Sequence, residues 1–291
     1  MSLNGELLES ITAAHLAPDE RRARLFDPRV LDVQLVTSPD GAAFDLAYAQ
    51  LWREFGEKHE MERRDVIAAR MARDPARPLV TRAGPAHLLY QMILARDATG
   101  AFAAVRDHTA IVLRDDKQPA VTVHLSHLLV APAHRGSGLA GWMRAWPIAT
   151  ARACAEVATG SGEAATTLVA EMEHADPIDA GRTARLIAYE KAGFRKIDPA
   201  AIDYLQPDFR DAGAIDADTV RPLPMSLVVR RVGRDAEETV SGAEVRRIVT
   251  ALYAMYGADF RETDMAPLYD RLSSLPAEDA KIALVPPTAQ R

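Results

Sequence analysis

The sequence has one cysteine, Cys154, among 291 residues and no run of 18 uninterrupted apolar residues. A single cysteine cannot form an internal disulfide, and a helix that crosses a membrane needs a longer apolar run. The N-terminus also lacks the basic-then-apolar pattern of a secretory leader. We therefore expect a cytoplasmic protein without a membrane partner, in which Cys154 is a small buried residue of a helix.

An excess of basic residues is also absent. The chain has 35 Lys and Arg against 41 Asp and Glu, a net charge of −6. This balance argues against nucleic acid as the main partner and weakly favours cationic substrates. Hydrophobic residues at 48% and charged residues at 26% are typical of a globular protein. The length allows one large domain or a domain with an extension.

The most informative stretch is 128–140, which predicts a strand, a glycine-containing loop and the start of a helix. An apolar run over 121–130 stops at Pro132, which has no N–H to donate. Gly136 and Gly138 then allow close backbone approach, and apolar residues follow at helical spacing. The free N–H groups of a helix start favour phosphate oxygens, and Arg135 adds positive charge. Alternatively, the glycines serve only to relieve crowding in a turn.

Two common nucleotide-binding motifs do not fit this loop. The G-x-x-x-x-G-K-[ST] spacing of a Walker loop is missing, together with its lysine. The dinucleotide pattern G-x-G-x-x-G is also missing, because Gly136 and Gly138 are followed by Gly141. No acidic ribose ligand stands about 20 residues further on, as that pattern requires.

Two motifs resemble those of the GNAT (GCN5-related) N-acetyltransferases. Arg135, Gly138 and Ala140 fill the acetyl-CoA motif Q/R-x-x-G-x-G/A, and Leu186–Phe194 resembles the signature that ends in Y-E-K-x-G-F. The resemblance implies the α/β GNAT fold, a mixed central sheet with flanking helices, over roughly residues 30–232. We accordingly divide the chain into an N-terminal arm (1–28), the acetyltransferase domain (29–233) and a C-terminal helical extension (234–291).

The extension carries an apolar stripe at helical spacing. Such a stripe must be covered, either by the domain itself or by a second subunit. A homodimer through these helices is therefore one expectation, and an intramolecular buttress is the alternative. The stripe comprises Val245, Ile248, Leu252, Met255, Leu268 and Leu272.

The resemblance implies transfer of an acetyl group from acetyl-CoA to a primary amine, of a small molecule or a protein, by direct attack in a ternary complex. Backbone groups of Arg135, Gly136, Ser137, Gly138, Leu139 and Ala140 would hold the pyrophosphate, and those of Leu128, Leu129 and Val130 the pantetheine. No metal is implied. Two alternatives remain: a non-catalytic acyl-CoA sensor, and an interaction protein that acts through the C-terminal helices.

Five side chains are candidates for the chemistry. His124 is a candidate general base, since a neutral imidazole suits that task near pH 7. Side chains two apart on a strand share a face, so His124, Ser126 and Leu128 should point one way and His127 the other. Each candidate also has a structural alternative as a core, surface or packing residue. Ser126 and Glu171 are candidate substrate ligands, Glu173 a second candidate base, and Tyr189 the position of the family's general acid.

One position departs from the family pattern. Arg182 stands seven residues before Tyr189, where the family often has an asparagine that contacts the cofactor. We therefore assign no cofactor contact to Arg182, although an arginine could reach a phosphate.

The apolar patterns predict the remaining elements. Pro147 should kink or restart the helix that follows the loop. Helices are expected around 46–55, 61–71 and 183–192, and strands over 30–36, 88–95, 102–113, 121–130, 166–173, 202–205 and 225–232.

Overall fold

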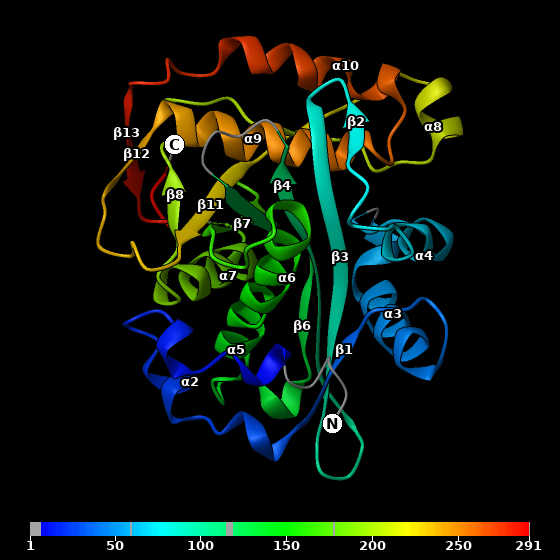
Figure 1. Ribbon diagram of the computed structural model, residues 1–291, viewed down its shortest axis with the longest axis vertical. Coiled ribbons are helices and arrows are strands. Elements are labelled where there is room, and N and C mark those ends of the chain that lie inside the picture. The colour runs from blue at the N-terminus through cyan, green and yellow to red at the C-terminus, as the bar shows by residue number, and fades with distance from the viewer. Residues whose placement is uncertain (1–6, 59, 115–118, 177, 291) are drawn as a thin grey trace.

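A mixed β-sheet of eleven strands organises the described part of the chain, residues 7–58, 60–114, 119–176 and 178–290 of a computed structural model (Figure 1). The main strand order is β1-β3-β4-β5-β7-β11-β8-β13-β12, with β2 paired to β3 and β6 paired to β4. These strands are β1 Asp32–Val36, β2 Leu79–Thr81, β3 Gly84–Arg96, β4 Phe102–Leu113, β5 Ala120–His124, β6 Leu128–Val130, β7 Ala165–Met172, β8 Arg195–Ile197, β11 Ser226–Arg231, β12 Thr239–Ser241 and β13 Lys281–Val285.

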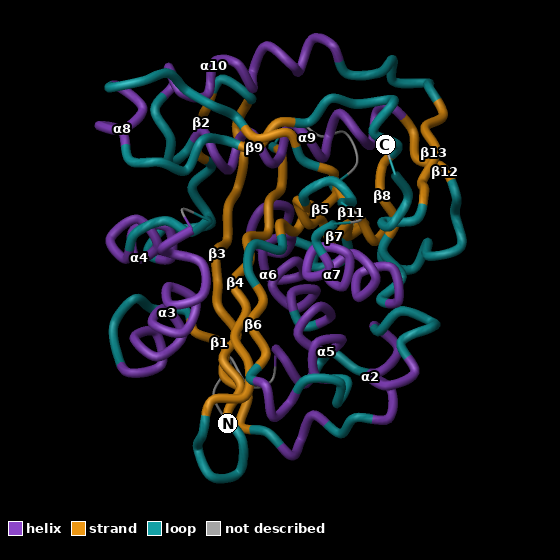
Figure 2. Tube along the Cα trace, turned by 180° about the vertical axis from the view of Figure 1, so that it is seen from behind, coloured by secondary structure: helices purple, strands orange, loops and turns teal. Residues whose placement is uncertain are grey.

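The sheet opens between β6 and β7. Strand β5 pairs in parallel with β7, and the last bond between them runs from the Leu125 N–H to the Val169 carbonyl, 2.7 Å. Beyond it, β6 pairs with β4, whereas β7 pairs with β11 (Figure 2). In the described part of the chain, the edge of β6 that faces away from β4 has no partner strand. We call this opening the wedge.

The expectation of one strand over 121–130 is wrong in its middle. Residues 125–127 belong to no strand. The carboxylate of Asp107 on β4 accepts the His127 N–H at 2.8 Å, and the Asp107 N–H donates to the His127 carbonyl at 3.3 Å. These bonds replace the regular ladder, so the chain kinks between β5 and β6.

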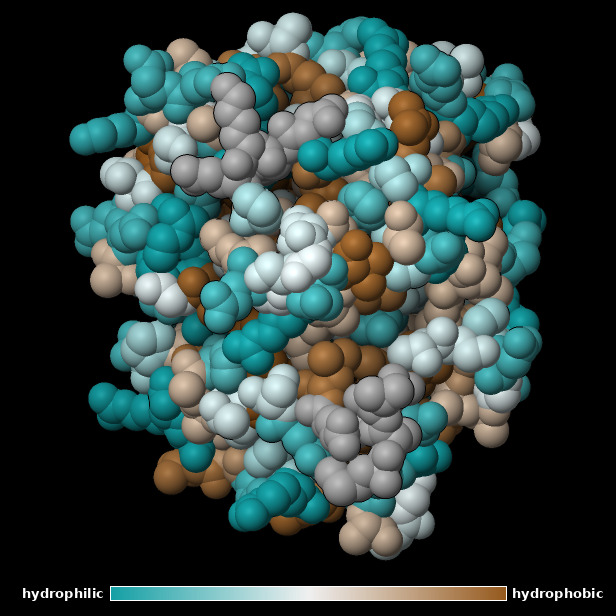
Figure 3. All heavy atoms as spheres, viewed as in Figure 1, coloured by the Kyte–Doolittle hydropathy of each residue, from teal (hydrophilic) through white to brown (hydrophobic). Residues whose placement is uncertain are grey.

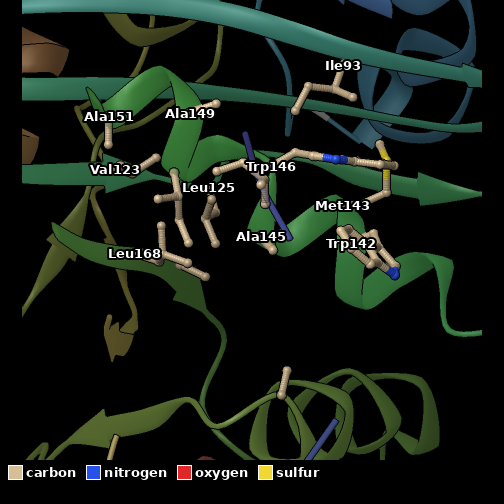
Figure 4. Packing of buried hydrophobic residues seen from close by; sticks show 14 of the residues in the cluster. Ile93, Val123, Leu125, Trp142, Met143, Ala145, Trp146, Ala149, Ala151 and Leu168 are labelled. Carbon is tan, nitrogen blue, oxygen red and sulfur yellow. The ribbon is translucent and has the colours of Figure 1, made fainter. Parts of the chain in front are cut away.

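One face of the sheet is covered by α5 (Leu139–Ala145), α6 (Pro147–Thr159) and α7 (Ala180–Lys191). Pro147 begins α6 directly after α5, as the helical pattern predicted. Aromatic and aliphatic side chains fill this interface (Figure 4). The buried set includes Ile93, Val123, Leu125, Trp142, Met143, Trp146 and Leu168, together with Cys154 of α6, whose pKa burial raises to about 12.

The opposite face carries helices from both ends of the chain. Alternate residues of β3 point to it, because side chains two apart on a strand share a face. Tyr90, Met92 and Leu94 pack with α3 and α4, and Leu88 packs with α9. The bounds of these three helices are α3 Ala42–Phe55, α4 Arg64–Met71 and α9 Gly242–Gly257. Elsewhere among the described residues lie α2 Arg21–Leu25, α8 Ala212–Asp216 and α10 Glu262–Arg271.

The C-terminal segment is built into the sheet. Strand β13 pairs with β8, β12 pairs with β13, and α9 lies on the sheet. The segment expected as helical thus also contains strands. Its apolar stripe is covered within the chain: Val245, Ile248, Leu252, Met255 and Leu268 are each at most 1% exposed, and Leu272 packs against the same cluster.

The other predicted elements are found with shifted bounds. The predicted strand over 202–205 is the exception, since only Leu205 is a strand residue there. It belongs to β9 (Leu205–Gln206), which pairs with β10 (Leu223–Pro224) in a separate two-stranded sheet. Tyr204 is instead buried beneath α9, where its ring stacks on Tyr253.

On the face drawn in Figure 3, hydrophobic residues lie in small groups among polar ones. No helix among the described residues is long and apolar enough to cross a membrane.

Candidate active site

Three of the predicted site residues meet where the wedge begins. His124 Nε2 lies 2.7 Å from Glu171 Oε2, and Ser126 Oγ lies 3.1 Å from His124 Nδ1. The side chain of Glu171 is 1% exposed and that of His124 is 8% exposed, whereas Ser126 is half-buried. Only the serine of this series thus presents a substantial surface to an incoming ligand.

Glu171 is held by two tyrosines from the C-terminal half of the chain. Tyr204 donates to its Oε1 at 2.6 Å, and Tyr256 of α9 donates to its Oε2. Burial alone would raise the pKa of Glu171, but the hydrogen bond and charge of His124 and the two hydroxyls bring that pKa below its ordinary value. An ionised Glu171 only accepts hydrogen bonds, so His124 Nε2 carries a proton. In the neutral imidazole, Nδ1 would then accept the Ser126 hydroxyl.

A second histidine–carboxylate pair lies beside the first. His127 Nδ1 is 3.0 Å from Asp107 Oδ1, and Tyr90 donates to Asp107 Oδ2 at 3.1 Å. Burial opposes the charge on His127, but Asp107 outweighs it and raises the pKa of His127 to about 9. Burial likewise opposes the charge on Asp107, yet His127 lowers its pKa. At neutral pH the pair is therefore an imidazolium and a carboxylate.

Both histidines line one cavity of about 40 Å³, between α4, α9 and the wedge. The expectation that His127 points away from His124 is wrong, because residues 125–127 leave the strand and the alternation of faces ends there. Glu60, Glu62, Arg70 and Tyr256 also line this cavity.

Buried ion pairs fix the cavity wall. Arg70 of α4 pairs with Glu62 and, at 2.9 Å, with Asp259 just beyond α9. Burial alone would lower the pKa of Arg70, yet the two carboxylates raise it above its ordinary value. These pairs hold α4 and α9 together across the cavity. With Arg70 and His127 each paired to carboxylates, the ionised Glu171 leaves the cavity wall acidic, which favours a cation.

Glu173 lies outside this cluster. Its side chain is 43% exposed and pairs with two arginines of α7, Arg182 at 2.9 Å and Arg185 at 2.8 Å. Arg182 also donates to the His174 carbonyl at 3.3 Å. The structure thus gives Arg182 a role at the start of α7, where Asp179 caps the helix by accepting the Arg182 N–H at 2.8 Å.

Tyr189 lies on the opposite face of the sheet from His124. Its ring packs edge-on against Phe194, with centroids 4.9 Å apart, and the Arg144 guanidinium lies 5.5 Å from the ring centre. It is half-buried, and it neighbours the buried Arg106 of β4. Arg106 stands opposite Leu128 in the β4–β6 register, so this group borders the wedge from the α5 side.

The loop at the end of β6 has the features that an anion site requires. Gly136 and Gly138 have φ of 75° and 108°, a region that favours glycine. No described residue accepts the N–H of Gly136 or Gly138, and Arg135–Ser137 are exposed. Gly138 caps the helix that begins at Leu139. The free amides and the charge of Arg135 therefore fit a diphosphate.

The N-terminal arm packs against the same helix. A Cβ at Gly138 would lie 2.4 Å from the Arg22 carbonyl, and Trp142 Nε1 donates to the Ala23 carbonyl at 2.8 Å. Arg144 donates to Glu20 at 3.1 Å. The absent side chain at Gly138 thus makes room for α2 as well as shaping the loop. The Arg22 guanidinium lies 3.5 Å from the Gly136 carbonyl and adds a second positive charge beside the loop.

Several residues of this site escaped the sequence reasoning: Asp107, Tyr204, Tyr256 and Arg106. Polar residues within the apolar run of 102–113 were a usable signal for Asp107 and Arg106, because a charge at a strand's centre needs a partner. The two tyrosines lie outside both motifs and gave no local signal. No group of three or more His, Cys, Asp or Glu among the described residues is placed to hold a metal ion.

Comparison with known proteins finds similarity in solved structures alone. No family model and no curated protein matches the chain. The GCN5-related glucosamine N-acetyltransferase region of a fungal multi-domain β-N-acetylglucosaminidase is 19% identical over 58% of this chain, with a TM-score of 0.35. The alignment spans only 17% of the fungal chain.

Two further neighbours are similar. A proposed phosphinothricin N-acetyltransferase is 14% identical, with a TM-score of 0.32, over 70% of this chain and 99% of its own. Nourseothricin acetyltransferase is 21% identical, with a TM-score of 0.24, over 48% of this chain and 62% of its own. All three neighbours are described as acetyltransferases, at similarities that leave function to be argued from the site.

Proposed function

We propose that this protein is an N-acetyltransferase that moves an acetyl group from acetyl-CoA to a primary amine, by direct attack while both substrates are bound. The observation that carries the proposal is the Glu171–His124–Ser126 series at the start of the wedge, reached along β6 from the glycine loop. The GNAT-like motifs around Arg135 and Tyr189 support the same reading. The small cavity favours an amine that is itself small or is carried on a slender chain.

The chain's residues fit two binding tasks. The amides of Gly136 and Gly138, with Arg135, would hold the diphosphate, and the free edge of β6 would pair with the pantetheine. When bound, acetyl-CoA supplies an activated acetyl carbonyl and a thiolate leaving group. Backbone groups near Leu128 would face the oxygen that gains charge.

An amine that enters the acidic cavity must lose a proton before it can attack. An alkyl amine near pKa 10.4 is charged at pH 7, and freeing its lone pair costs about 4–5 kcal/mol. Glu171 and its neighbours favour the ammonium form on entry. Ser126 Oγ then accepts a proton from the nitrogen as its own proton passes to His124 Nδ1. The ionised Glu171 stabilises the resulting imidazolium through His124 Nε2.

A screen of amines tests the proposal, with CoA release measured and the product identified by intact mass. With the best amine, Glu171→Gln should lower kcat/KM by about 100-fold or more, the usual range for loss of general-base catalysis. Calorimetric affinity for CoA should stay unchanged. Glu173→Gln is the matched control and should stay within a few-fold of the wild type, because its carboxylate faces α7.

Three results would count against this account. Equal losses in Glu171→Gln and Glu173→Gln would contradict the role given to Glu171. CoA binding without turnover of any amine would favour the sensor alternative. A wild type that turns over no amine and does not bind CoA would overturn the proposed function.

A further inference from the structure

Arg106 is a buried cation that forms no ion pair with a carboxylate among the described residues. Its side chain is 0% exposed, and Nη1 donates to the Met143 carbonyl at 3.2 Å. Nε and Nη2 are buried and have no hydrogen-bond partner among the described residues. Leaving charged donors unpaired in an apolar interior is costly, so such a group usually has a use.

Arg106 lies near two other side chains that border the wedge from the α5 side. Arg106 extends from β4, Arg144 from α5 and Tyr189 from α7, and the Arg144 guanidinium lies 5.5 Å from the Tyr189 ring centre. Glu20 of the arm pairs with Arg144, and Asp107 on β4 pairs with His127 on the opposite face. Of the two guanidinium groups near this phenol, Arg144 is thus paired with a carboxylate and Arg106 is not.

Burial lowers the pKa of Arg106, and the neighbouring Tyr189 acts against that shift. The interaction is reciprocal, because a phenolate beside a guanidinium is stabilised by the same amount as the guanidinium. A negative charge on the Tyr189 oxygen would therefore be stabilised by Arg106.

Building on the proposed function, we propose that Arg106 is a positioning residue that acts through Tyr189 to stabilise the thiolate of CoA. When the carbon–sulfur bond of the thioester breaks, the sulfur keeps the electron pair. The Tyr189 proton moves to that sulfur, and the phenolate left behind is stabilised by the neighbouring Arg106 guanidinium until water reprotonates it. The ammonium nitrogen loses two protons in becoming the amide, one before its attack and one after it. Each leaves through Ser126 and His124 to water, and one returns from water to Tyr189, so one proton is released overall.

The test compares the binding of CoA and desulfo-CoA, which lacks the thiol, by calorimetry between pH 6.5 and 9.5. A free thiol has a pKa near 8.5. In the wild type we expect the ratio of the affinity for CoA to the affinity for desulfo-CoA to rise about tenfold as the pH rises. The reason is that a bound thiolate gains a charge-assisted hydrogen bond. In Arg106→Met the ratio should stay near one at every pH. Arg96→Met, at the end of β3 where Arg96 pairs with Asp32, is the control and should keep the wild-type ratio.

The outcomes separate the two proposals. A wild type that binds neither ligand overturns the proposed function. Binding of both ligands with the same ratio in wild type and Arg106→Met overturns the role of Arg106 and leaves the proposed function standing. Arg106→Met should fold, since an apolar isostere replaces an unpaired buried charge. If it does not fold, Tyr189→Phe decides: loss of the pH-dependent gain supports the proposal, and an unchanged gain overturns it.

Discussion

At the scale of single residues, Gly138 has two separate reasons to be glycine. Its φ of 108° disfavours any side chain, and a Cβ would also meet the Arg22 carbonyl at 2.4 Å. Gly100, in the turn between β3 and β4, has φ of 82° and nothing within 4 Å of a Cβ. Comparing substitutions at these two glycines therefore separates the energetic cost of backbone strain from that of a steric clash.

Gly138→Ala should therefore lower the free energy of unfolding more than Gly100→Ala. We expect about 1 kcal/mol for Gly100→Ala, from conformational strain alone, and about 3 kcal/mol for Gly138→Ala, which adds displacement of α2. Urea unfolding of both variants measures the difference. Equal losses would show that α2 does not press against the loop.

At the scale of elements, the local parts of the site were predictable. The glycine loop before α5 and the helix that carries Tyr189 are continuous in sequence, so residue spacing identified both. The break at 125–127 was not predictable in this way, because it depends on the Asp107 carboxylate of another strand. For the same reason the pairing of His124 with Glu171 and the placing of Glu173 against α7 needed the folded chain.

The C-terminal elements are part of the fold and of the site. Helix α9 buries apolar residues on the sheet, β13 extends it, and Tyr256 donates to Glu171. Deletion of residues 234–291 should therefore abolish cooperative thermal unfolding, because it uncovers a core face. Tyr256→Phe changes the same segment less, because it removes only the hydroxyl that donates to Glu171, and this variant should fold. A truncated chain that unfolds cooperatively would show that the segment is an appended unit, as the dimer-arm alternative requires.

At the scale of the whole molecule, the buried His127–Asp107 pair links stability to pH. The folded pKa of His127, about 9, lies above its reference value of 6.5. The stabilisation is therefore fully present below about pH 6.5 and is lost as the pH rises to about 9. The difference amounts to about 3 kcal/mol for a buried pair.

His127→Gln should remove this pH dependence. Denaturant unfolding at pH 6.5 and pH 9 should show the wild type losing about 3 kcal/mol more than His127→Gln over that interval. The sign follows from the raised pKa, since the folded state binds the additional proton. A variant with the same slope as the wild type would show that His127 is uncharged in the folded protein.

The central claim is that acetyl-CoA binds along β6 with its diphosphate on the amides of the glycine loop. Hydrogen–deuterium exchange of residues 128–140, with and without saturating acetyl-CoA, tests it most directly. The Gly136 and Gly138 amides, which have no acceptor among the described residues, should exchange markedly more slowly with the ligand bound. Unchanged exchange at both glycines under saturating acetyl-CoA would contradict the account.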